Sequence, residues 1–166
     1  MRLFTAFMLF FTFFVSVHAG EDASQHNVSI TISPFHLLNP ELHLTGELRL
    51  AAKMSAAAML GAGMVTDDDK RYGIWEVGGQ FRYYLLGSFI HGMMLGADVG
   101  YVDVNGQMEH PMAYYVGARA GAFLGYKITI KTGFTVEAQY GPVYVRENAD
   151  NSELQTLINF KVGWSL

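Results

Sequence analysis

The sequence predicts an all-β fold, an eight-stranded antiparallel up-and-down transmembrane β-barrel, and three observations indicate it. Apolar and polar residues alternate with period two in eight segments of about ten residues, which is the length of a tilted membrane-spanning strand. Short and longer links alternate between these segments, which places short turns at one rim and loops at the other. Charged residues make up only 16% of the chain, against about 25% in an average soluble domain.

The remaining composition excludes several classes of protein. The net charge of −4 argues against a nucleic-acid binder, because such a protein needs a basic face. The absence of cysteine excludes disulfides and cysteine-based zinc sites. The chain is 51% apolar and 14% aromatic, which is enough to bury a core and argues against disorder. Composition thus predicts a class of protein but no reaction, and neither a metal nor another cofactor is expected.

Residues 1–19 predict a cleaved secretory signal peptide. Arg2 precedes an uncharged apolar run that ends at Val17, and Val17-His18-Ala19 forms a small-x-small pattern before Gly20. A membrane anchor is the alternative, but the run of about 15 apolar residues is shorter than the ~20 that a spanning helix needs. The barrel domain is therefore expected over residues 20–166.

Four of the predicted strands lie in the first half of the mature chain, at about 27–33, 42–50, 54–64 and 75–85. The segment at 54–64 is rich in Ala, Met and Gly, and on its own it also permits a helix. In the other three, apolar residues recur at alternate positions, with glycine at 46 and 79: Val28, Ile30 and Ile32; Leu42, Leu44, Leu48 and Leu50; Trp75, Val77, Phe81, Tyr83 and Leu85.

The second half repeats the pattern at about 92–101, 114–125, 133–141 and 158–166, with glycine frequent on the polar face. The apolar positions are Met93, Leu95, Ala97, Val99 and Tyr101; Tyr114, Val116, Ala118, Ala120, Ala122 and Leu124; Phe134, Val136, Ala138 and Tyr140; Ile158, Phe160, Val162, Trp164 and Leu166.

The links between segments fall into two sets. Short links are expected around 51–53, 86–88 and 127–131, and longer polar links at 66–73, 105–111 and 146–153. The first link, at 34–40, belongs to the loop rim but is apolar. We expect it to fold over the rim or dip into the interface, and the alternative is the mouth of a path for apolar molecules.

Two features of the alternating faces predict that the apolar face meets lipid. The polar face is narrow and rich in glycine, which suits the cramped interior of an eight-stranded barrel. Aromatic residues gather near the strand ends, as in the two interfacial belts of a membrane protein. The predicted belts are Trp75, Tyr101, Tyr114 and Tyr144 beside the loops, and Tyr83, Tyr126 and Trp164 beside the short turns. A soluble carrier barrel, with its apolar face inward, is the alternative.

The polar face also carries charges of both signs in equal number. Inside a closed barrel such charges must pair, because an isolated buried ion is costly. A static plug is favoured over a switchable ion-pair gate, since eight strands leave room for side chains rather than for a solute. The predicted lumen ion-pair residues are Glu47, Glu76, Asp98 and Glu137 with Arg49, Arg82, Arg119 and Lys161.

Over the whole mature chain this pattern resembles the small bacterial outer-membrane β-barrels, which include the transmembrane domain of outer-membrane protein A and its short adhesin-like relatives. The last segment, with Phe160, Val162 and Trp164, is similar to the signal read by the barrel-assembly machinery, although it ends on Leu166 and not on an aromatic residue. The resemblance implies an outer-membrane location, contact with lipid and lipopolysaccharide, periplasmic short turns and extracellular loops.

No catalytic or metal-binding residue is predicted. Ser33 and His36 lie at the rim where a lipid A-modifying enzyme would act, but no nucleophile motif surrounds them, and His43 is expected to be a polar lumen residue. The acidic run at 67–69 lacks the spacing of a calcium loop and is expected to be a solvated tip. The expected role is structural or surface-interacting, with a narrow channel for small or hydrophobic solutes, or a lipid A-modifying enzyme, as alternatives. The sequence leaves the ligand and the oligomeric state open.

Overall fold

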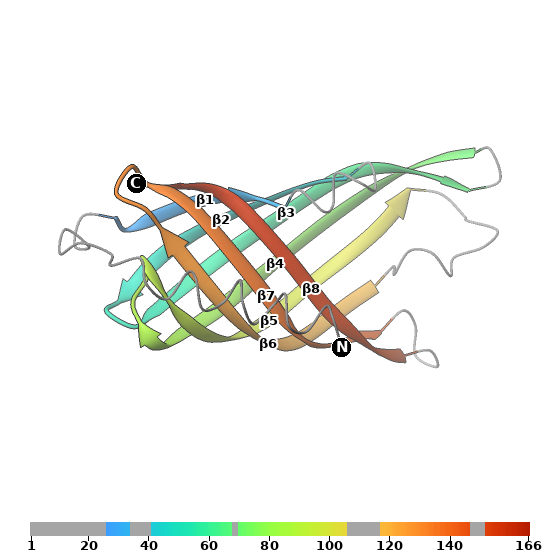
Figure 1. Cartoon of the computed structure of the whole chain (residues 1–166). Helices are drawn as coiled ribbons and strands as arrows, with labels where there is room; N and C mark the ends of the chain where they lie inside the picture. Colours follow the sequence, from blue (N-terminus) through green and yellow to red (C-terminus); the bar gives the residue numbers. More distant parts are fainter. Residues whose placement is uncertain (1–25, 34–40, 68–69, 106–116, 147–151) are drawn as a thin grey trace, which may run out of the picture.

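Eight strands form one closed antiparallel barrel in the computed structural model, which describes residues 26–33, 41–67, 70–105, 117–146 and 152–166 (Figure 1). The strands pair in chain order, and β1 pairs with β8 to close the sheet. They are β1 (Val28–Ile32), β2 (Glu41–Ala51), β3 (Met54–Asp67), β4 (Lys70–Gly87), β5 (His91–Asn105), β6 (Gly117–Thr129), β7 (Phe134–Arg146) and β8 (Ser152–Ser165). The predicted all-β, eight-stranded, up-and-down fold is confirmed.

Some sequence predictions lie outside the described residues. These are the signal peptide at 1–19, the apolar link at 34–40 with His36, Asp68 and Asp69 of the acidic run, most of the links at 105–111 and 146–153, and Tyr114 and Val116 at the start of the sixth segment. The part of the chain that the structure describes contains no helix long and apolar enough to cross a membrane.

The strand register fixes the width of the barrel. Ile30 of β1 pairs with Trp164 of β8, but a ladder followed from Ile30 through all the other strands reaches β8 at Leu154, ten residues earlier than Trp164. This offset tilts the strands by roughly 40° and, with eight strands, leaves an interior just wide enough to be filled by side chains. Side chains from opposite strands therefore meet across the lumen.

Side chains alternate between the exterior and the lumen along every strand. Large apolar side chains are exposed on all eight strands; examples, one per strand from β1 to β8, are Ile30, Leu44, Leu60, Phe81, Val99, Leu124, Tyr140 and Ile158. Polar and charged side chains fill most of the interior. The predicted orientation, apolar outside and polar inside, is confirmed. Near the loop rim the interior becomes apolar, with Ile74, Val102, Val143 and Val145 buried.

The predicted strand at 54–64 is confirmed, whereas two predicted links differ from the structure. Residues 54–64 form part of β3, paired with β2 and β4, so the helical alternative is wrong. The link predicted at 66–73 is mostly strand, because β3 and β4 continue until Asp67 pairs with Lys70. The β-branched residues Val65 and Thr66 favour this extension. The resulting β3–β4 hairpin reaches further than the other strands, at the upper right of Figure 1. In contrast, β1 has only 5 residues.

The link predicted at 127–131 is also misplaced. Strand β6 continues to Thr129, and the chain turns over 130–133, where Gly133 has a φ of 89° that favours glycine. Lys127 is consequently a lumen residue rather than a turn residue, and its side chain is fully buried. The polar face of a strand near a turn is easily mistaken for a polar link, because both are hydrophilic.

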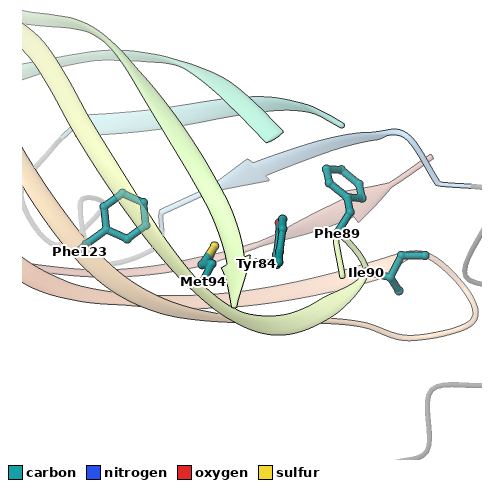
Figure 2. Packing of buried hydrophobic residues seen from close by; sticks show 5 residues of the cluster. All are labelled: Tyr84, Phe89, Ile90, Met94 and Phe123. Atoms are coloured by element: carbon teal, nitrogen blue, oxygen red, sulfur yellow. The ribbon is translucent and has the colours of Figure 1, made fainter. Parts of the chain in front are cut away.

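An apolar cluster occupies the short-turn half of the lumen. The β4–β5 turn bends at Gly87, whose φ is 79°, and Phe89 and Ile90 are buried. They form one buried cluster with Tyr84, Met94 and Phe123. Figure 2 shows these five side chains following one another along the inside of the barrel toward the turn. The predicted short link at 86–88 thus leads into a segment that helps fill the lumen.

Interior glycines make room for these side chains, which gives a stability prediction. A Cβ built on Gly96 would lie 2.2 Å from Cζ of Phe123. We expect Gly96→Ala to lower the free energy of unfolding by about 1–3 kcal/mol through overpacking. The matched control is Gly46→Ala on the exterior, where an added Cβ meets nothing within 4 Å, and we expect no loss. The urea unfolding midpoints of the two variants test this prediction. Equal midpoints would contradict the close packing of Phe123 against Gly96.

Candidate functional site

The most densely charged region of the lumen centres on Glu47 and Arg82, which come from β2 and β4. Arg82 Nη1 lies 2.8 Å from Glu47 Oε2 and 2.8 Å from Glu137 Oε2 of β7. Lys127 Nζ of β6 lies 2.7 Å from Glu47 Oε2. Arg82 and Lys127 are fully buried, so these contacts replace the water that charged groups normally require. Four strands are tied together across the lumen.

Neutral donors complete the shell of Glu47. The hydroxyls of Ser55 and Tyr84 donate to Glu47 Oε1, at 2.6 and 2.9 Å. Both oxygens of this buried carboxylate are therefore engaged by hydrogen-bond donors, two of them cationic. Such complete satisfaction is what makes a buried carboxylate tolerable.

Glu137 is held in a similar way. Gln139 Nε2 donates to Glu137 Oε1 at 2.5 Å, and Lys161 Nζ of β8 lies 4.0 Å from the same oxygen. Together with Glu47, Arg82 and Lys127, these residues form what we call the turn-side cluster: Glu47, Arg82, Lys127, Glu137 and Lys161. Its formal charge is +1, because three cations face two carboxylates.

A second group, the loop-side cluster, lies nearer the loops and consists of His43, Glu76, Asp98 and Arg119. Arg119 contacts Glu76 through Nη2, and its Nε lies 3.2 Å from Asp98 Oδ1. His43 Nε2 lies 3.2 Å from Glu76 Oε2, and His43, Glu76 and Asp98 are all buried. With His43 neutral the formal charge of this cluster is −1.

Gln80 connects the two clusters. Its Nε2 donates to Asp98 Oδ2 at 2.8 Å, and its Oε1 accepts a hydrogen bond from Arg82 Nη2 at 2.7 Å. Gln139 Nε2 also donates to Gln80 Oε1 at 3.0 Å. The clusters thus form one polar network along the lumen, and their formal charges cancel.

The turn-side end of this network is covered by apolar and hydroxyl groups. Lys127 Nζ lies 3.8 Å from the centre of the Phe89 ring, a cation–π contact. Beyond it, Thr135 Oγ1 lies 2.9 Å from Thr129 Oγ1 and 2.7 Å from Ser165 Oγ. The lumen is therefore filled from the charged clusters to the short-turn rim.

Seven of the eight residues predicted to form lumen ion pairs belong to these clusters, and Arg49 does not. Arg49 is half-buried beside the irregularity between Arg49 and Ala51, and its Nε donates to the Ala51 carbonyl at 3.4 Å. Within the described residues it makes no ion pair. Lys127 supplies the fourth cation instead. The sequence signal for Lys127 is parity, because it continues the inward row of Arg119, Gly121 and Gly125.

The aromatic residues predicted as two belts point outward where the structure describes them. Trp75, Tyr83, Tyr101, Tyr144 and Trp164 are exposed on the barrel exterior, and Tyr126 is half-buried. Trp75 and Tyr101 contact each other with ring centroids 5.9 Å apart, and Trp75 Nε1 lies 3.2 Å from Asp103 Oδ2. Trp164 Nε1 donates to the Thr132 carbonyl at 2.9 Å. The indole N–H of each tryptophan is thus hydrogen-bonded near one of the two rims.

Two of the three residues weighed as catalytic candidates, Ser33 and His43, are buried. Ser33 Oγ donates to Asn159 Oδ1 at 2.9 Å, His43 belongs to the loop-side cluster, and His36 lies outside the described residues. Among the residues with described positions, no group of three or more His, Asp or Glu side chains is arranged to hold a metal ion.

The fold and the lumen define a closed eight-stranded β-barrel with an apolar exterior and a polar, ion-paired interior. Comparisons of the chain with protein-family models, with curated proteins and with solved structures find no match.

Proposed function

We propose that the protein is a non-enzymatic barrel of the bacterial outer membrane, with a structural or surface-interaction role and a lumen closed to solutes. The observation that carries this proposal is that the two faces are reversed relative to a soluble protein: apolar side chains cover the outside of the barrel, while ion pairs fill the inside. A signal peptide at 1–19 would direct the chain out of the cytoplasm. Its partners would be outer-membrane lipid, lipopolysaccharide and, during biogenesis, the barrel-assembly machinery.

The apolar exterior supports the membrane location. Contiguous exposed apolar patches on soluble monomers rarely exceed a few hundred Å². Here large apolar side chains are exposed on every strand, including Leu60 and Val99 at mid-height, each more than half exposed. Lipid would cover this surface, and β1 closes the sheet by pairing with residues 162–165 of β8. Trp75 and Trp164 at opposite rims suit the two membrane interfaces.

The filled lumen supports closure to solutes. A passing ion would have to separate Arg82 from two carboxylates, each 2.8 Å away. It would also meet Tyr84 and Phe89, which are fully buried within the same half of the lumen. Separating buried, hydrogen-bonded ion pairs is costly because each charge is left without its partner.

The β3–β4 hairpin favours a surface role. It continues to the Asp67–Lys70 pair, past the point where β4 pairs with Asn105, the last residue of β5. In an outer membrane this hairpin would project from the loop rim into the surroundings, where a partner could reach it.

Planar-bilayer recording tests the closed lumen. We expect wild-type protein to show no conductance steps at any voltage, after a gel has confirmed that the reconstituted barrel is folded. We would also record Phe89→Ala, which shortens the side chain that covers the turn-side end of the lumen. Its matched control is Leu86→Ala, which changes an exterior side chain near the same turn. Reproducible wild-type steps would contradict the proposal and favour the narrow channel instead.

A further inference from the structure

Among the residues that the structure describes, the charged side chains at the short-turn rim are all cationic. Outside the lumen, the described residues at this rim contribute Arg49, Lys53 and Lys131, and no acidic side chain among them. Lys53 and Lys131 are exposed, and Arg49 is half-buried. The two histidines of this rim, His26 and His91, are half-buried.

These cations are spread around the rim rather than gathered on one side. Lys53 lies in the turn between β2 and β3, and Lys131 in the turn between β6 and β7. Four strands separate these turns in either direction around the closed sheet, so the two lysines lie on opposite sides of the barrel. A surface that meets both must extend across the whole end of the molecule.

The formal charges inside the lumen are also positive toward the short-turn rim. The turn-side cluster has formal charge +1 and the loop-side cluster −1, with His43 neutral. The positive charge of the short-turn end is thus reinforced from inside, and the loop-side half of the lumen has the opposite sign.

We propose that the short-turn rim binds a planar layer of anionic phospholipid headgroups, so that the leaflet on that side is enriched in anionic lipid around the barrel. This inference rests on the proposed membrane location and adds a lipid preference to it. Basic side chains beside a membrane surface attract anionic lipids. Lysine side chains at a barrel end can reach the phosphates while their methylene groups stay beside the acyl chains.

The two tryptophans allow each rim to be probed separately, because the chain contains no others. Trp164 is half exposed and donates to the carbonyl of Thr132, the neighbour of Lys131, whereas Trp75 lies near the loop rim beside Asp103. The variant Trp75→Phe retains only the short-turn reporter, and Trp164→Phe retains only the loop reporter. Each is reconstituted in vesicles of phosphatidylcholine and phosphatidylglycerol, with bromine on the acyl chains of one lipid or the other.

We expect brominated phosphatidylglycerol to quench Trp164 preferentially, with a relative binding constant over phosphatidylcholine of roughly fivefold, the factor that one basic side chain near an anionic surface supplies. Trp75 should show no preference for the anionic lipid. Adding Lys131→Gln should remove the preference at Trp164, while the matched loop-rim change Arg146→Gln should leave it unchanged. High salt should also reduce it, since the Debye length falls from about 10 Å at 0.1 M to about 3 Å at 1 M.

Equal quenching of Trp164 by the two brominated lipids would overturn the lipid preference but leave the membrane barrel intact. The same holds if the preference survives Lys131→Gln. If neither brominated lipid quenches either tryptophan, the barrel is not embedded in the bilayer, and both this inference and the proposed function fail.

Discussion

Replacing Glu47 with glutamine is expected to lower the free energy of unfolding by about 3–5 kcal/mol, the cost of leaving buried charges without their partner. Glu47 faces Arg82 at 2.8 Å and Lys127 at 2.7 Å. Without its charge, the turn-side cluster would hold three cations against one carboxylate. The free energy of unfolding is measured by urea unfolding of the barrel reconstituted in vesicles, with tryptophan fluorescence as the signal.

A comparison with Arg82→Met separates charge balance from lost contacts. Arg82 takes part in as many ion pairs as Glu47, yet its removal leaves Glu47 with Lys127 and Glu137 with Lys161, so the cluster becomes neutral. We therefore expect Arg82→Met to be the milder change. Glu153→Gln, at an exposed residue of the loop rim, is the control and should shift stability by no more than about 0.5 kcal/mol. The opposite order of the two lumen variants would refute the role of charge balance.

A charge on the middle of the exterior should be the second most damaging change. We expect Val99→Lys to cost about 2–4 kcal/mol in a bilayer, because the ammonium would lie in the hydrocarbon layer. Val99 is 58% exposed on β5, so packing within the protein does not explain such a loss. Unfolding in vesicles measures it.

The control for that change is Leu86→Lys, which places the same charge on the exterior close to the short-turn rim. Near the interface the expected cost is only about 0–1 kcal/mol. If Val99→Lys is tolerated as well as Leu86→Lys, the exterior meets water, and a soluble carrier barrel becomes the better account.

The fold could be predicted because a barrel of this kind imposes period two on every strand. Leu42, Leu44 and Leu48 point outward while His43, Thr45 and Glu47 point inward, and this alternation is visible without any structure. Most members of the charged clusters could be predicted for the same reason. Their partners could not, since the Arg82–Glu137 pair depends on the register of strands far apart in the sequence.

Two predicted links were wrong because their hydrophilic residues continue a strand instead of ending it. Lys127 looked like part of a polar link, and residues 66–73 looked like a loop, but pairing with a neighbouring strand extends β6 and the β3–β4 hairpin through them. The lumen side chains Met94 and Phe123 were missed for a different reason. They occupy inward positions where glycines on the adjacent strand, Gly125 and Gly96, leave space for them, and only the register shows those neighbours.

Cell fractionation followed by gel electrophoresis, with and without boiling, tests directly whether the protein is a closed barrel of the outer membrane. We expect the protein in the outer-membrane fraction, and we expect the unheated sample to migrate differently from the boiled one, because a closed hydrogen-bonded barrel resists detergent until heated. A protein that is found in the soluble periplasm, with the same mobility before and after boiling, would contradict the membrane barrel.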